Sequence, residues 1–125
     1  IEVVGYRQRK KGIKFLGDLC SDFGVNVKFV IGKKSKYRRI NFGKLKSRIE
    51  NKKTKQLVLG HTSTVYINPL NSLKFVLNKL KKDKIILNKN FYVFTGSTVG
   101  VTPIIGKGIY HGKIDKLSSV KAKIF

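Results

Sequence analysis

The chain has 125 residues, of which 28 are Lys or Arg and 6 are Asp or Glu, so its formal net charge is +22. Its apolar fraction of 41% is enough for a folded core, which excludes a disordered chain, and no apolar run reaches the roughly 18 residues of a membrane span. The length suits one domain over 1–125, and the single cysteine, with no signal-peptide pattern in the charged first residues, leads us to expect a cytoplasmic protein.

The positive charge comes mostly from lysine, which A/T-rich codons favour together with Asn and Ile. A net charge of this sign attracts anions, and the basic run 33–39, "KKSKYRR", is the place where a nucleic-acid backbone would bind. Arginine, which nucleic-acid readers use for bidentate contacts, is scarce, and no helix-turn-helix or zinc-finger pattern accompanies the run. A nucleic-acid-binding module is therefore kept as an alternative, and we expect no nucleic-acid partner.

The first third of the chain reads as strands and loops. Residues 1–5, "IEVVG", predict a strand, and 6–17 predict a basic loop with two glycines. Residues 25–32, "VNVKFVIG", alternate and then run apolar, which predicts a second strand ending at Gly32. The chain contains no Met and opens inside a predicted strand, so we expect a further segment before Ile1.

The middle of the chain predicts a hairpin followed by a helix. The hairpin spans 43–60, with arms at 45–49 and 56–59 and a tip at 50–53. The helix begins after Asn68, which can cap it, with Pro69 at the first helical position. Apolar residues then recur at helical spacing to about residues 82–83, namely Leu70, Leu73, Leu77 and Leu80.

The last third predicts a strand, a polar loop and a second hairpin. Residues 91–94, "FYVF", predict the strand, and 95–100, "TGSTVG", follow as the loop. Residues 106–114 and 119–125 predict the hairpin, closed at 115–118. Strands with one clear helix between them predict an α+β, β-rich fold.

Acidic residues are few, and three of them lie in apolar surroundings. Glu2 lies within the first predicted strand, where a charge is costly unless it is paired or bound to metal. Asp18 and Asp22 flank Cys20 in a segment expected to be a loop. The cysteine is interpreted as a buried apolar residue. Glu50 and Asp83 lie among lysines at predicted turns, where surface pairing accounts for them.

Four stretches in register resemble the 2-keto-4-pentenoate hydratase and 4-oxalocrotonate decarboxylase group of the fumarylacetoacetase-like superfamily. The family patterns are an E-[VL]-[VI]-D-x-R segment, a D-T-x-[AS]-D-N segment, an N-P-x-N-[AS]-[LV] helix and a final S-G-S loop and strand. In this chain they correspond to "IEVVGYR", "DLCSDFGVNVKFVIG", "NPLNSLKFVLNKL" and "FTGSTVGVTPIIGKG" closing with "LSSVKAKIF".

The resemblance implies the C-terminal part of a mixed β roll with a Mg²⁺ or Mn²⁺ site. Glu2 matches the third carboxylate ligand of the metal, Asp22 would support the site or handle a proton, and Thr95, Gly96 and Ser97 would face the substrate. The implied activity is that of a lyase, a hydratase or decarboxylase of aromatic catabolism. Its substrate is a 2-oxo acid such as 2-hydroxypenta-2,4-dienoate, which reacts through a metal-stabilised enolate.

The resemblance also sets limits. The family's E-x-E metal ligands and active-site lysine precede the matching segment, so residues 1–125 in isolation are expected to be inactive, and the full-length protein is expected to form a homo-oligomer. Gly5 stands where the family commonly has Asp, and Phe23 replaces an Asn. These departures keep a second alternative open, a catalytically degenerate scaffold of the same fold.

Overall fold

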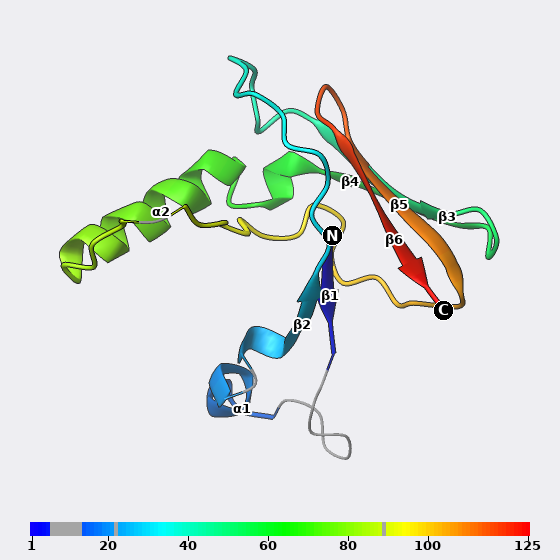
Figure 1. Cartoon of the computed structure of the whole chain (residues 1–125), viewed down its shortest axis with the longest axis horizontal. Helices are drawn as coiled ribbons and strands as arrows, with labels where there is room; N and C mark the ends of the chain where they lie inside the picture. The colour runs from blue at the N-terminus through cyan, green and yellow to red at the C-terminus, as the bar shows by residue number, and fades with distance from the viewer. Residues whose placement is uncertain (6–13, 22, 89) are drawn as a thin grey trace.

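The computed structural model of the chain describes residues 1–5, 14–21, 23–88 and 90–125. In this part of the chain there are two antiparallel sheets and few helices (Figure 1), which are β1 (Glu2–Val4), α1 (Leu16–Ser21), β2 (Asn26–Phe29), β3 (Lys46–Asn51), β4 (Gln56–His61), α2 (Pro69–Lys82), β5 (Gly108–Ile114) and β6 (Ser119–Ile124). Short 3₁₀ turns, Phe23–Val25 and Thr62–Thr64, lie before β2 and after β4. The protein is thus a small mixed α/β, β-rich domain, and the prediction is confirmed at that level.

The larger sheet has the strand order β4-β3-β5-β6, and each neighbouring pair is antiparallel. Both predicted hairpins are confirmed, as β3–β4 and β5–β6. The first is longer than predicted, because the ladder continues until Asn51 pairs with Gln56. Glu50, expected at the hairpin tip, therefore lies within β3, opposite Leu57 of β4 and His111 of β5.

Residues that pair across strands point to the same side of the sheet, so the pairing assigns each side chain to one of two faces. The two faces differ in composition. The inner face carries buried side chains, namely Ser47, Asn51, Tyr110 and Ala122. The outer face carries cations and exposed apolar side chains, namely Arg48, Leu57, Leu59, Ile109, Lys113, Lys121 and Lys123. Among the described residues the buried apolar side chains are Leu45, Val65, Tyr110 and Ala122, so the core is small and includes two residues of the inner face.

The smaller sheet is the antiparallel pair β1–β2, and it meets the inner face of the larger sheet. An added Cβ at Gly112 would lie 3.2 Å from Ile1 Cγ1, so the first residue packs closely over β5. Gly32 lies close to β6, because a Cβ added to it would be 2.8 Å from the backbone oxygen of Ser119. The predicted strand ending at Gly32 is longer than β2, which ends at Phe29, although Ile1 and Val30 still exchange backbone hydrogen bonds at 2.8 and 2.9 Å.

The helix α2 begins and ends as predicted. Asn68 Oδ1 accepts from the Leu70 backbone N–H at 3.0 Å, and Pro69 occupies the first turn. The Asp83 carboxylate lies 2.8 Å from Lys79 Nζ, which confirms the surface pairing expected for Asp83. No residue of α2, all of which are described, is buried, and the helix extends away from the sheet (Figure 1). Within the described part of the chain, no helix combines the length and the apolar character that crossing a membrane requires.

Three local predictions are wrong. Residues 91–94, expected to form a strand, are irregular, because no strand of the described chain pairs with them. Asp18, expected in a loop, lies in the first turn of α1, where its Oδ2 accepts from the backbone N–H groups of Lys14 and Phe15 at 3.0 and 3.1 Å. Cys20 in the same helix is exposed, so its interpretation as a buried residue is also wrong.

Candidate functional site

Glu2, the predicted metal ligand, lies in β1 with its side chain exposed. Its Oε1 accepts a hydrogen bond from Asn26 Nδ2 of β2 at 2.9 Å. The carboxylate is thus tolerated in the strand without burial, because it is exposed and a neighbouring amide pairs with it. The backbone nitrogen of the adjacent Ile1 donates to Val30 O at 2.9 Å.

An aromatic stack joins the Glu2 strand to the segment that precedes the predicted substrate loop. Glu2 is directly opposite Phe29 in the β1–β2 ladder, so the two side chains share one side of this ribbon. The rings of Phe29 and Phe94 are stacked, with centroids 3.6 Å apart and an interplanar angle of 17°. Thr95 follows directly in the chain. The strand pair that carries Glu2 is thereby linked to the residue that precedes the loop.

The loop 95–100 is held by its own hydrogen bonds. Ser97 Oγ donates to Gly100 O at 2.8 Å and accepts from the Val99 N–H at 3.3 Å. Thr64 Oγ1 donates to Ser97 O at 3.2 Å. The Ser97 hydroxyl, predicted to contact substrate, thus serves the loop conformation in this structure. Gly96 has a φ of +132°, and a Cβ there would lie 3.1 Å from Val65 Cγ1, so a larger residue is strained at this position.

The loop rests on the inner face of the four-stranded sheet. Thr98 O accepts from the His61 N–H at 3.0 Å and from Ser47 Oγ at 3.4 Å. Gly60 leaves room for this approach, because a Cβ there would lie only 2.0 Å from Thr98 O. Since Ile1 packs over Gly112 on the same face, the β1–β2 ribbon and the loop cover the inner face together.

The remaining predicted site residue, Asp22, lies outside the described residues. Among those described, no group of three or more His, Cys, Asp or Glu side chains could hold a metal ion. Glu2 offers one carboxylate, and a Mg²⁺ or Mn²⁺ site needs further oxygen ligands. The described residues by themselves therefore do not fit a complete metal shell.

Sequence reasoning missed one interaction between ionisable groups. His111 Nδ1 of β5 lies 3.3 Å from Glu50 Oε1 of β3, and both side chains are half-buried. Only the pairing of β3 with β5 brings these residues together, so no local pattern in the sequence pointed to the contact.

Comparisons of the chain with family models, with curated proteins and with solved structures find no match.

Proposed function

We propose that this chain forms part of a divalent-metal-dependent lyase of the fumarylacetoacetase-like superfamily that acts on a 2-oxo acid. The observation that supports the proposal is the stack of Phe29 on Phe94, which links the strand pair that carries Glu2 to the residue that precedes the loop 95–97. These are the two regions in which the resemblance places a metal ligand and the substrate contacts.

Each residue has a distinct role in the proposal. Glu2 contributes one carboxylate to the metal shell, and Asn26 orients that carboxylate through its 2.9 Å hydrogen bond. Thr95 and the backbone of Gly96 contact the substrate carboxylate. Ser97 stabilises the loop conformation through its hydrogen bonds to Gly100 O and the Val99 N–H. A bound Mg²⁺ or Mn²⁺ would supply Lewis acidity towards the 2-oxo acid.

The experiment uses the full-length protein, with Glu2→Gln and Asp83→Asn as a matched pair. Both changes remove one carboxylate charge, but Asp83 lies on α2 and pairs with Lys79. Glu2→Gln is expected to weaken Mn²⁺ binding by about 10- to 100-fold in calorimetry and to lower the turnover of 2-hydroxypenta-2,4-dienoate by a similar factor. Asp83→Asn is expected to change neither quantity.

Three outcomes separate the alternatives. Turnover that is equal in wild type and Glu2→Gln would falsify the role of Glu2. Absence of both metal binding and turnover in the wild type identifies the degenerate scaffold. DNA or RNA binding that falls steeply with salt, together with no turnover, favours the basic nucleic-acid-binding module.

A further inference from the structure

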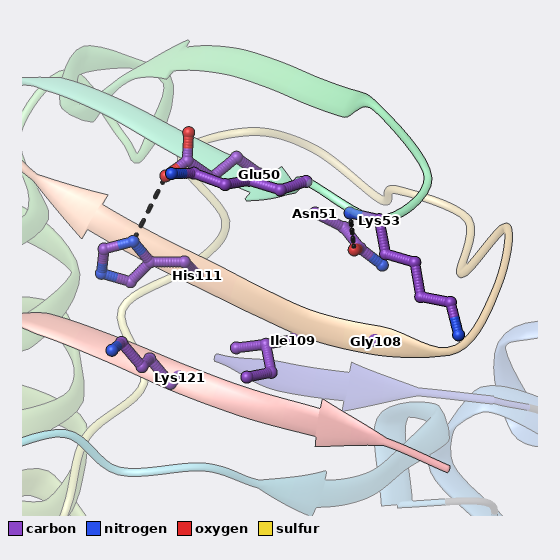
Figure 2. A pocket seen from close by; sticks show the side chains of 8 residues that line it. Glu50, Asn51, Lys53, Gly108, Ile109, His111 and Lys121 are labelled. Atoms are coloured by element: carbon purple, nitrogen blue, oxygen red, sulfur yellow. Dashed lines mark hydrogen bonds and ion pairs between the residues drawn. The ribbon is translucent and has the colours of Figure 1, made fainter.

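A cavity of about 660 Å³ opens where the β3–β4 turn meets the start of β5. Its lining includes Asn51, Lys52, Lys53, Ile109, His111 and Lys121 (Figure 2). This volume lies within the range of roughly 300–1,000 Å³ that is usual for small-molecule sites. Its lining takes Ile109, His111 and Lys121 from the outer face and Asn51 and Gly108 from the inner face, at the end of the sheet that carries the β3–β4 turn. Neither Glu2 nor a residue of the loop 95–100 lines it, so this cavity differs from the region of Glu2 and the loop.

The charge around the cavity is positive. Three lysines line it, and Lys121 of β6 is directly opposite His111 of β5. The one carboxylate in the lining, Glu50, lies 3.3 Å from His111 Nδ1 (Figure 2). The three lysine ammonium groups outnumber this single carboxylate, so the field in the cavity attracts an anion.

Two nitrogen atoms in the cavity wall are shielded from water and lack a hydrogen-bond partner within the described chain. One is Asn51 Nδ2, on a side chain that is 1% exposed, and the other is His111 Nε2. The Asn51 amide is oriented by its other atom, since Oδ1 accepts from the Lys53 N–H at 3.1 Å. Buried polar groups normally have partners, so the wall of the cavity holds two nitrogen atoms whose hydrogen-bonding capacity the described chain leaves unused.

A glycine allows Asn51 to occupy this position. An added Cβ at Gly108 would lie 2.8 Å from Asn51 Oδ1 and 3.0 Å from Nδ2, and the φ of Gly108 is +140°. Any other residue would push the amide away and strain the start of β5. The end of the cavity is thus formed by a glycine and a buried amide that fit against each other.

The cavity also has an apolar part. Ile109 is 51% exposed, and its side chain lies between the strands near His111 and Lys121 (Figure 2). A bare inorganic ion would leave this surface in water. An organic molecule with one anionic group would cover it and place its charge among the lysines.

We propose that the outer face of the four-stranded sheet binds a small organic anion, a compound with a phosphate or carboxylate head and a short apolar body, in the cavity of His111, Lys121 and Ile109. The ligand's oxygen atoms accept from the lysine ammonium groups, and its apolar body lies on Ile109. The site is separate from the proposed lyase site and does not depend on it.

The test is calorimetry on the full-length protein with phenyl phosphate and phenylacetate as probes, which distinguishes the two head groups. Phenol and inorganic phosphate serve as the neutral and the non-apolar comparisons, and both are expected to bind more weakly. Lys121→Gln is expected to weaken binding of the preferred probe by at least about fivefold. Lys123→Gln, two residues along the same strand and face but outside the cavity lining, is expected to stay within about twofold.

Several results would overturn the proposal. Equal weakening by Lys121→Gln and Lys123→Gln would mean that the probe responds to the general charge of the face. Displacement of the probe by a short DNA duplex, with equal losses in both variants, would assign the face to a polyanion. Absence of binding by both organic probes would remove the site. Glu2→Gln is expected to leave probe binding unchanged, so failure of the lyase proposal is distinguishable from failure here.

Discussion

Adjacent residues of β4 show how different the two faces of the four-stranded sheet are. Gly60 lies on the inner face, where Thr98 O would be 2.0 Å from an added Cβ. Leu59 precedes it on the outer face and is 71% exposed. A single methyl group cannot be added on one face, while a whole leucine side chain lies in solvent on the other.

The difference teaches that each face is specified by a different kind of interaction. On the inner face, small residues permit close contacts, at Gly60 with the backbone of the 97–100 loop and at Gly112 with the Ile1 side chain. On the outer face, charge dominates, with Arg48 directly opposite Lys113. We therefore expect inner-face substitutions to change stability through packing and outer-face substitutions to act through weak electrostatics.

The largest expected effect is that of Gly60→Ala. The new methyl group must displace Thr98 O, which accepts from His61 N–H, so the loop has to move away from the sheet. We expect the free energy of unfolding to fall by about 3 kcal/mol, at the upper end of overpacking costs. Chemical denaturation measures this, with Leu59→Ala as the matched control on the outer face. Equal losses in the two variants would contradict the distinction between the faces.

A smaller effect is expected for Tyr110→Phe on the inner face. Tyr110 is 6% exposed, and its hydroxyl donates to Gly106 O at 3.1 Å. Removing the hydroxyl leaves the ring packed and removes one hydrogen bond, so we expect a loss of about 1 kcal/mol. Thermal unfolding followed by circular dichroism measures it. Tyr37→Phe, at a tyrosine that is 76% exposed, is the control. A similar loss of stability there would show that the loss at Tyr110 does not come from its buried hydrogen bond.

Local patterns in the sequence predicted the elements that depend on local interactions. The cap at Asn68 and the two hairpins are determined by residues close together in the chain, and all three are confirmed. The strand expected at 91–94 shows the limit of such patterns, because an apolar run specifies an extended chain only where a partner strand is available. No described strand pairs with it, and Phe94 stacks on Phe29 instead.

The candidate site was predictable only in part, for the same reason. The resemblance selected Glu2 and the loop 95–97 from sequence, but it contained no information on the stack that connects them. It also assigned a substrate contact to Ser97, whose hydroxyl is taken up by Gly100 O and the Val99 N–H. Simple alternation along β1 would have placed Glu2 in solvent, and the apolar neighbours of Glu2 led to the opposite expectation.

The smallest expected effect belongs to the outer face and tests whether charge is what distinguishes it. Lys113 is directly opposite Arg48 in the β3–β5 ladder, and like charges in such a pair are destabilising. Lys113→Glu converts the pair into one of opposite charge, so we expect stabilisation of about 0.5 kcal/mol at low ionic strength. High salt should remove the gain, because the pair is exposed and screening acts on it fully. Lys107→Glu changes the net charge equally but lies outside the ladder, so it separates the pairwise effect from relief of the overall +22 charge. A gain that persists in high salt, or that Lys107→Glu reproduces, would show that pairing across the strands does not govern this face.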